Sequence, residues 1–572
     1  MKINFLRNSI LTLFLLFSAT MMAQDLGSET VVVVKPYSPS VNDANKIRET
    51  PSISDSLGME KKIVQYSIIS VPVASTFAPA KGRAANVERQ RPPEIYDNYI
   101  TLGFGSYTSV LAEFYSNIEI SRSDNFGIFL NHNSAQGGME EVEFDHHYYD
   151  TELNLNYTSR NRDMVWNTDF GVEHQLHNWY GVDFPLGTDM EGFTPEHNYY
   201  SVRAGGEITL DESFFDRAAA SYRYFGDDYS SVEHRFQVEP SLEIPIGGEL
   251  FNTTFLLDYL STTFAEQPLA GTTNEFNFLN LGVASGLLVL RDDLTLDLGA
   301  GVYYSYDSNG GESNIYVYPQ VTASYALAGE YFIAYAGLEG ELRQNSYYEL
   351  VQLNPFLAPN LVIHPTDRQY NGYVGAKGKL SGSVGYNIRG SYISENYKPL
   401  IHSLPWVANS DREDYEYGNS FAVVYDQVKT LSAFGELVFD LSRDFTLGVN
   451  AEVFTYDTDV EEEAWNLPNL KANILADYQI SESWFAGANV FFVGERKDHI
   501  PSFALNPGPD EIVTLDGYVD LNANLGYRFN DRLSIFAKGY NLLGENYEKW
   551  MDYPVLGLQL MGGATYKFDF GR

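Results

Sequence analysis

The 572-residue sequence contains no cysteine. Disulfides, thiolate metal sites and lipid attachment through an N-terminal cysteine are therefore excluded. After the first 23 residues the sequence also lacks an apolar run long enough for a transmembrane helix. The mean hydropathy of −0.24 is low. A membrane β-barrel remains compatible with this value, because its strands place apolar residues only at every second position.

Positive charge is scarce, and the net charge is −39. Residues 98–572 hold 26 Lys and Arg against 67 Asp and Glu, so this part of the chain should repel nucleic acid. An acidic surface suits cationic ligands or divalent ions, although a solvated acidic exterior is the favoured interpretation. The sequence also lacks a Walker loop, a His-Glu-x-x-His motif and a Gly-x-Ser-x-Gly motif. We therefore predict no enzymatic activity and no cofactor.

The first 23 residues have the features of a secretory signal peptide. Lys2 and Arg7 supply the positive region, Ile10 to Phe17 the apolar core, and Ala23 a small residue before a cleavage site. The sequence therefore predicts an exported protein whose stability comes from hydrogen bonding and packing.

Aromatic residues are abundant, at 15% of the chain, with 42 Tyr and 36 Phe. Both favour strands, and Tyr is enriched where lipid meets water. The alternation is clearest near the C-terminus, where an apolar set interleaves with a polar, charged or glycine set: Val519, Leu521, Ala523, Leu525, Tyr527 and Phe529 against Asp520, Asn522, Asn524, Gly526 and Arg528. A period of two places the sets on opposite faces of a strand, as lipid outside and a wet lumen inside require.

Strand patterns begin at Asn98 and continue to the end of the chain. Short turns mostly alternate with longer loops, as in outer-membrane barrels with periplasmic turns and external loops. Every long loop falls on the outer side only if Phe421 to Asp426 is counted within a loop, which gives 22 strands. A soluble β-propeller is the alternative, but the four-strand sequence repeat it would show is not found. We predict an all-β fold, a transmembrane antiparallel β-barrel of about 22 strands with an extended periplasmic N-terminal segment.

The last 55 residues resemble the end of a TonB-dependent receptor barrel. The matching features are Asp520-Leu521-Asn522, Asn541 to Tyr547, Trp550 with Tyr553-Pro554, Gly557 with Gly562-Gly563, and the closing Tyr566 to Phe570. This resemblance implies an integral receptor of the Gram-negative outer membrane that takes up or binds a solute.

Residues 24–97 differ from the strand-rich remainder, because they are rich in proline and alternate weakly. Glu29, Thr30, Val31, Val32, Val33 and Val34 look like a TonB box, the segment that pairs with an energising protein's strand. An ordinary periplasmic strand or docking segment is the alternative. The family carries a globular plug here, whereas these residues show no plug-like pattern. We expect this segment, folded-in loops or a partner to fill part of the pore.

Aromatic residues also crowd the predicted loops, where they could stack on a flat ligand. The candidate ligand-binding residues are Trp179, Tyr180, Tyr347, Tyr348, Trp406 and Trp465. Interfacial girdles and loop packing are the alternative roles.

Three groups could suggest a metal site. His146 and His147 point to opposite faces if a strand begins there, and His174 and His177, three residues apart, have the same problem. The acidic loop at Asp457 to Glu463 lacks EF-hand spacing. We therefore predict no metal site.

The sequence thus predicts three parts: a signal peptide (1–23), a periplasmic segment (24–97) and an outer-membrane barrel (98–572). The leading function is solute uptake or binding across the outer membrane. The alternative is a non-transporting barrel that anchors or scaffolds envelope proteins. The expected partners are outer-membrane lipid, an unidentified solute, and a TonB-like energising protein or another periplasmic protein.

Deletion of residues 29–34 separates the two functions when uptake and co-purification of periplasmic proteins are measured together. If the segment is a TonB box, uptake is lost because β-augmentation is lost. Loss of a co-purified periplasmic partner with uptake unchanged would support the scaffold.

Overall fold

The computed structural model describes residues 95–570, except 138–141, 143, 145, 183–192, 212–213, 247–248, 268–272, 408–411 and 501–510. The signal peptide, the TonB-box-like residues 29–34 and all but the last three residues of the segment 24–97 lie outside the described residues. The assignments made for them stay predictions.

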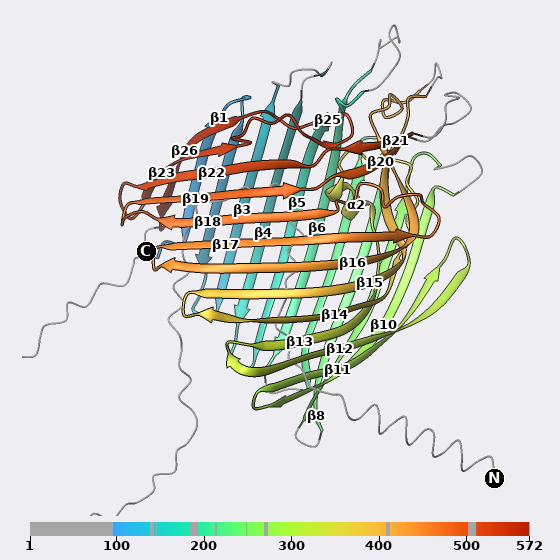
Figure 1. The fold of residues 1–572 in the computed structure, drawn as a ribbon, viewed down its shortest axis with the longest axis vertical. Helices are drawn as coiled ribbons and strands as arrows, with labels where there is room; N and C mark the ends of the chain where they lie inside the picture. The colour runs from blue at the N-terminus through green and yellow to red at the C-terminus, as the bar shows by residue number, and fades with distance from the viewer. Residues whose placement is uncertain are drawn as a thin grey trace, which may run out of the picture. The chain divides into compact units, whose positions relative to one another are not determined.

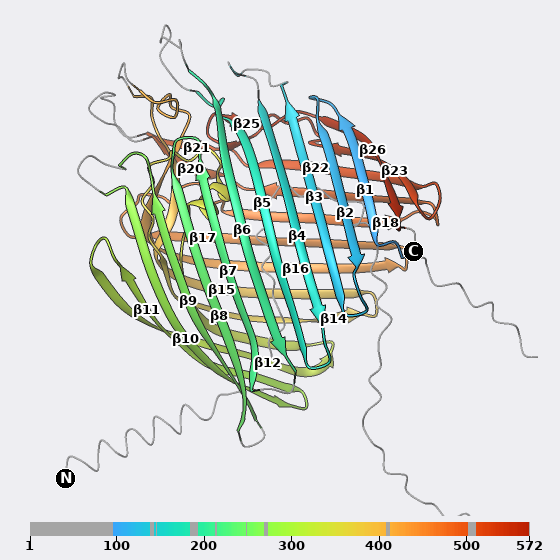
Figure 2. The same ribbon diagram turned by 180° about the vertical axis from the view of Figure 1, so that it is seen from behind.

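The described chain forms one closed antiparallel sheet of 22 strands, as predicted (Figures 1 and 2). The first and last strands close the ring, with Asn98 opposite Phe568 and Gly105 opposite Met561. The strands are β1 (Asn98–Gly105), β2 (Val110–Glu119), β3 (Asp124–Gln136), β4 (His147–Arg160), β5 (Met164–Asn178), β6 (Glu196–Leu210), β7 (Phe215–Asp227), β8 (Val232–Ile246), β9 (Glu249–Thr263), β10 (Glu275–Arg291), β11 (Leu294–Asp307), β12 (Glu312–Glu330), β13 (Ile333–Arg343), β14 (Thr366–Ser381), β15 (Val384–Ser403), β16 (Phe421–Ser442), β17 (Phe445–Thr458), β18 (Leu470–Gln479), β19 (Trp484–Val493), β22 (Tyr518–Arg528), β23 (Leu533–Tyr540) and β26 (Gln559–Phe568).

The two ends of the barrel differ in their connections. At the end where β1 begins and β26 finishes, the strands are joined by tight turns such as Asp292-Asp293. At the other end most connections are long, and the longest lie at 179–195, 344–365, 404–420, 494–517 and 541–558. Short turns face the periplasm and long loops face outward in outer-membrane barrels. The long-loop end is therefore the outer mouth.

Neighbouring rows across the sheet show the alternation that the sequence predicted. On one face Glu436, Asn450 and Asn473 lie in one row and Asn489 lies opposite Asn522, and the adjacent row on the other face holds Leu437, Val449, Ile474, Val490 and Leu521. The polar row faces the lumen, where Asn473 donates to Asn489 at 2.9 Å. The apolar row faces lipid. None of the described helices is long and apolar enough to span a membrane.

Large aromatic side chains mark the end of the barrel that carries the short turns. Phe214, Tyr331, Trp484 and Phe529 are exposed there, and the Trp484 ring packs on Tyr527 with centroids 4.9 Å apart. Aromatic rings at this level match the interfacial girdle of membrane barrels. This end of the barrel therefore lies at a membrane–water interface.

Two sequence-based assignments of loop structure were wrong. Phe421 to Asp426 is the outer part of the 22-residue strand β16 and not part of a loop. A helical turn was also missed: α2 (Tyr347–Leu353) lies in the loop between β13 and β14. The loop at 494–517 additionally contains a small hairpin of β20 (Arg496–Ile500) and β21 (Glu511–Leu515).

The C-terminal motif is a compact loop between β23 and β26, which also holds the short strands β24 (Glu548–Trp550) and β25 (Tyr553–Pro554). Asn541 has φ +45° and donates its side-chain amide to the carbonyls of Glu545 and Leu556. Asn tolerates this left-handed backbone better than most residues. The motif therefore folds the last outer loop.

Because Ile474 and Asn473 are adjacent on opposite faces, they provide a matched test of this orientation. Ile474→Arg should destabilise the barrel by about 2–4 kcal/mol, because it places a charge in hydrocarbon near the middle of the wall. Asn473→Arg should destabilise the barrel by only about 1 kcal/mol, the net contribution of one hydrogen bond. Urea unfolding in lipid vesicles measures both. Equal destabilisation by the two variants would contradict the assigned faces.

Candidate functional site

The loop between β13 and β14, residues 344–365, folds into the barrel and is called the cap below. It contains α2, which lies within the ring of strands near the outer mouth (Figure 1). Ser346 starts the helix, because its side chain accepts a hydrogen bond from the Glu349 amide at 3.2 Å. The cap leaves the wall at β13 and β14 and reaches lumenal residues of β5 to β8. It therefore bridges the lumen.

A buried carboxylate on β8 holds the first turn of the cap. Glu233 is 1% exposed and accepts hydrogen bonds from the Tyr347 amide at 2.5 Å and the Thr262 hydroxyl at 2.9 Å. The Arg223 guanidinium lies 3.5 Å away and supplies the opposite charge. A buried carboxylate is tolerated only with such partners.

A second anchor joins the helix to β8 and β9. Arg235 donates to both oxygens of Asp258, at 3.0 and 2.8 Å, and to Glu349 at 2.8 Å. A guanidinium that bridges two carboxylates in a buried place is held in a fixed orientation. Arg235 therefore ties α2 to the wall.

Aromatic residues close over the outer part of the cap. The Pro355 carbonyl accepts hydrogen bonds from the Tyr199 hydroxyl at 2.8 Å and the Trp179 indole at 3.2 Å. Phe356 stacks on Tyr553 with centroids 3.7 Å apart. The surrounding buried residues, called the mouth cluster, are Trp179, Tyr180, Tyr199, Phe225, Leu260, Phe264, Phe276, Phe278, Tyr347, Leu350, Val351, Phe356, Leu357, Ala358, Leu361, Ile363, Ile401, Tyr415, Phe421, Val423 and Tyr553.

The mouth cluster joins loops that are far apart in the sequence. The Tyr553 hydroxyl donates to the Asn419 carbonyl at 2.6 Å, and the Tyr180 hydroxyl donates to the Pro554 carbonyl at 2.8 Å. The C-terminal loop thus packs on the cap as well as on its own strands. Removal of one member should loosen the others, because they share one core.

The predicted ligand-binding aromatic residues are divided among three places. Trp179, Tyr180 and Tyr347 belong to the mouth cluster, and Tyr348 packs against it. Trp406 lies apart under the Arg412 guanidinium, 5.3 Å from it. Trp465 lies in a separate cluster with Leu400 and Val428 and stacks on His499. All six contact other parts of the chain, and their role in ligand binding stays a prediction.

The sequence offered three groups as metal candidates. Among the described residues no group of three or more His, Asp and Glu side chains has the geometry to hold a metal ion. In the acidic loop, Asp426 accepts hydrogen bonds from the backbone amides of Asp459, Val460 and Glu461. This loop is therefore ordered by a carboxylate from β16. His146 lies in another loop, and burial lowers its pKa to about 4, so it is neutral at pH 7.

Sequence analysis missed the charged residues on the lumenal wall below the cap. Arg203, Arg223 and Arg235 lie side by side on β6, β7 and β8. Like charges directly opposite each other destabilise a sheet, and nearby carboxylates offset this here. Each Arg occupies a polar position of an alternating strand, which was visible in the sequence. Their alignment depends on the strand register, which was not.

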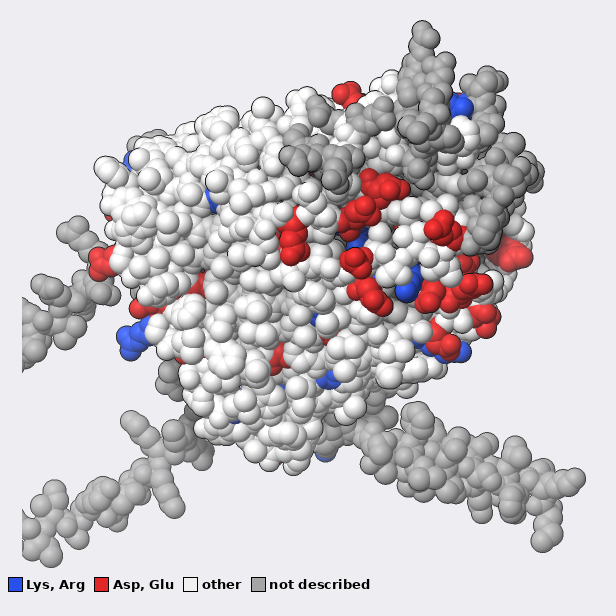
Figure 3. Space-filling view, turned by 45° about the horizontal axis from the view of Figure 1, so that its top comes forward, with Lys and Arg blue, Asp and Glu red and all other residues white. Residues whose placement is uncertain are grey.

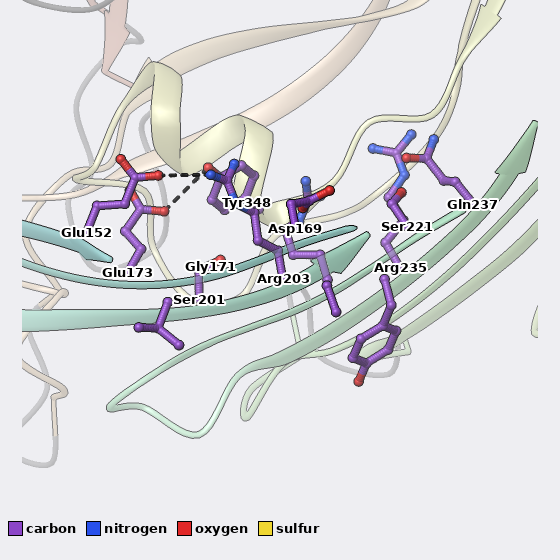
Figure 4. A pocket seen from close by; sticks show the side chains of 14 residues that line it. Glu152, Asp169, Gly171, Glu173, Ser201, Arg203, Ser221, Arg235, Gln237 and Tyr348 are labelled. Atoms are coloured by element: carbon purple, nitrogen blue, oxygen red, sulfur yellow. Dashed lines mark hydrogen bonds and ion pairs between the residues drawn. The ribbon is translucent and has the colours of Figure 1, made fainter. Parts of the chain in front are cut away.

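These residues border a cavity of about 290 Å³ (Figure 4). The lining comes from β4 to β8 and from Tyr348 on α2: Glu152, Asp169, Gly171, Val172, Glu173, Ser201, Arg203, Ala204, Ser221, Tyr222, Arg223, Arg235, Gln237 and Tyr348. Figure 4 shows Glu152 paired with Arg203, at 3.2 Å, and Tyr348 bonded to Glu173, at 3.4 Å. The Arg223 guanidinium lies 4.1 Å from the centre of the Tyr348 ring. The cavity therefore lies between the wall and the cap.

The outer surface has a different charge distribution. Figure 3 shows acidic side chains gathered near the loops, while most of the visible barrel wall carries no charge. This matches a wall in contact with lipid and an end in contact with water.

Comparison with known proteins identifies the fold. No protein-family model matches the sequence, and no curated protein matches it. Solved structures do match. The siderophore receptor PirA from Acinetobacter baumannii has a TM-score of 0.61 at 13% identity, over 84% of this chain and 81% of PirA. A variant of the ferric enterobactin receptor PfeA from Pseudomonas aeruginosa has a TM-score of 0.59 at 12% identity, over 84% and 81%.

The copper transporter OprC also matches, with a TM-score of 0.59 at 12% identity over 84% of this chain and 82% of OprC. These neighbours are named as receptors and a transporter. The predicted resemblance is confirmed for the barrel.

The cap can be separated from the wall by one substitution. Glu233→Ala should destabilise the cap by about 3 kcal/mol, because the Tyr347 amide and the Thr262 hydroxyl lose their buried acceptor. Hydrogen exchange at the Tyr347 and Tyr348 amides should then accelerate by about 100-fold or more.

Glu452→Ala is the matched control, since Glu452 faces Arg389 on the lumenal wall at 3.9 Å and has no part in anchoring the cap. Unchanged exchange in Glu233→Ala would mean that apolar packing alone holds the cap.

The closed 22-stranded barrel and the solved structures that match it identify the fold. The chain is an integral outer-membrane protein with the fold of TonB-dependent receptor barrels.

Proposed function

We propose that this protein is a gated barrel for solute uptake across the outer membrane, with the cap as the gate. The observation that carries the proposal is the position of the cap. It bridges the lumen at the outer mouth and is fastened to the wall by polar contacts, among them those of Glu233 and Arg235, and by the mouth cluster. A solute entering from outside has to pass it.

The cap is suited to opening because it is a separate unit from the wall. Each wall strand is paired with a neighbour on both sides, whereas the cap joins the wall through the backbone bridge of Leu357 to Phe421 and through side-chain contacts. Elements that move in gating are drawn from the least stable parts of a structure. Opening the cap would break its own contacts and leave the strand pairing intact.

The named ligands of the neighbours support this class of function. PirA is a siderophore receptor, PfeA a ferric enterobactin receptor and OprC a copper transporter. Within the proposal, energy for uptake comes from a TonB-like protein that pairs with residues 29–34. The alternative, a non-transporting scaffold, does not require the cap to move.

Removal of the cap tests the gate. A variant in which a short Gly-Ser linker replaces residues 346–363 should have a higher single-channel conductance in planar bilayers than the wild type, because the bridge across the lumen is gone. The Glu233→Ala variant should show more frequent opening events, and Glu452→Ala should behave like the wild type. Equal conductance of the cap-deleted and wild-type proteins would contradict gating by the cap.

A further inference from the structure

The wall contains a stretch where a strand lacks one of its two neighbours. β12 pairs with β11 from its outer end at Glu312, but its pairing with β13 begins only at Gln320, opposite Glu339. Nearer the outer mouth β13 bends at an irregularity between Glu339 and Glu341 and pairs only with β14. Among the described residues, 312–319 therefore have a strand neighbour on one side, and their other side is called the β12 edge below.

A proline explains why the pairing stops. The amide of Ala326 donates to the Asp293 carbonyl, on the β11 side, and backbone groups point to alternate sides along a strand. The β11–β12 register has no irregularity, so even-numbered residues of β12 direct their N–H and C=O groups toward β11, and odd-numbered residues direct theirs toward β13. Pro319 is the odd-numbered residue that follows the last pair toward the outer mouth, and it has no N–H to donate. The ladder to β13 therefore ends there.

Tyr318 lies in the space between β12 and β13. A Cβ added at Gly340 would lie 2.7 Å from Cδ1 of Tyr318, so the tyrosine ring lies against this glycine of β13. The Tyr318 hydroxyl donates to Asp367 of β14 at 2.8 Å, and the side chain is buried. Pairing of β13 with residues 312–318 would require this ring to move. The β12 edge is therefore open to a strand from elsewhere.

The side chains beside the β12 edge are apolar and exposed. Ile315 and Val317 are 72% and 67% exposed, and they lie opposite Tyr304 and Val302 of β11, which are exposed as well. In both ribbon views the tip of the β11–β12 hairpin stands apart from the strands that follow it (Figures 1 and 2). The hairpin thus carries an apolar strip that ends at unpaired backbone groups.

The β12 edge lacks most of the features that protect a sheet edge. Native proteins cover an exposed edge, or interrupt it with lysine, proline or a bulge. Residues 312–318 contain neither lysine nor proline, and the run from Ile315 to Tyr318 consists of residues that favour strands. An edge of this kind is a template for an added strand.

We infer that the β12 edge binds an extended segment of a partner protein, which adds to the wall as one more strand near the outer mouth. Ser313, Ile315 and Val317 would exchange backbone hydrogen bonds with it, and apolar side chains of the segment would cover the apolar strip. Asp307 and Glu312, at the tip of the hairpin, form no ion pair with a described residue. A basic residue at one end of the segment would complement them.

The inference goes beyond the proposed uptake function and does not depend on the gate, because an added strand requires no movement of the cap. Failure of either therefore leaves the other standing. Two other occupants of the β12 edge are a second copy of the chain and a lipid headgroup, and the test separates both from a partner strand.

The test uses the full chain in lipid nanodiscs that hold one copy each, with the synthetic peptide acetyl-Arg-Thr-Val-Thr-Val-Thr-Arg-amide as the added strand. Hydrogen exchange of the amides in residues 312–319 should slow by at least about 10-fold at saturating peptide, because hydrogen-bonded amides exchange only when the structure opens. The same peptide with its three central nitrogens methylated keeps every side chain but loses these donors. It should bind at least about 10-fold more weakly in fluorescence anisotropy.

Val317→Pro and Val317→Thr form a matched pair of variants. The proline removes an N–H that faces the gap and leaves the even-numbered residues paired with β11, so protection by the peptide should be lost. The threonine keeps the N–H and a β-branched side chain, so the peptide affinity should stay within about threefold of the wild type. The comparison of the two peptides needs no variant, so it decides the question even if Val317→Pro does not fold.

Equal binding of the plain and methylated peptides, or no binding of either, would overturn the inference. Slow exchange of residues 312–319 without peptide would also overturn it, because the edge would then be covered already. If that protection appears only in nanodiscs with two copies, the occupant is a second copy of the chain. If it appears only in nanodiscs that contain lipopolysaccharide, the occupant is a lipid headgroup.

Discussion

Hydrocarbon offers no hydrogen-bond partner to a peptide group, and the architecture depends on that constraint. Every strand in the membrane needs a neighbour on both sides, so the sheet has to close. Closure joins β1 to β26, whose paired residues are more than 450 positions apart in the chain. The Thr101 and Thr565 hydroxyls share a buried hydrogen bond of 2.9 Å across this seam. Closure then fixes one face of each strand toward lipid and leaves the other free to be polar.

The face that is free to be polar lines the lumen. A protein of this net charge places arginines in a row on its inner wall and surrounds them with carboxylates. The cap uses the same charges, since Glu233 binds its first turn and Arg235 its helix. Among the described residues the large apolar cluster inside the barrel lies near the outer mouth, where the cap and the loops cover it, while Phe485 and Phe536 pack on the lumenal face nearer the short turns. The barrel therefore has a polar interior closed by an apolar, aromatic mouth cluster.

The sequence was sufficient to predict the strands of the barrel wall but not the structure of the outer mouth, for a physical reason. Alternation marks a strand only where its two faces meet different surroundings. Ile474 and Asn473 are such positions, because one faces lipid and the other faces the lumen. The predicted count of 22 strands was right. Phe421 and Val423 are apolar although they face inward, because they pack in the mouth cluster. The alternation is lost there, so the outer part of β16 was assigned to a loop.

The cap was missed for related reasons. In α2, Tyr347, Leu350 and Val351 have helical spacing, but seven residues are too few to establish a period. The aromatic residues chosen from the sequence did lead to this region, since Trp179, Tyr180, Tyr347 and Tyr348 all lie at the mouth. The arginine row could not be inferred in the same way. Arg203, Arg223 and Arg235 come together only through the register of three strands.

The cavity and the cap share side chains, which couples them energetically. Arg223 borders the cavity and also donates to Ser346 of the cap at 3.1 Å, while Tyr348 of the cap covers the Arg223 guanidinium. A solute that takes over Arg223 therefore competes with the contacts that hold the cap closed. Linkage is reciprocal: a ligand that weakens the cap by some factor is itself bound more tightly, by the same factor, when the cap is open. If the cavity is occupied from outside, the energy that opens the gate comes partly from the solute.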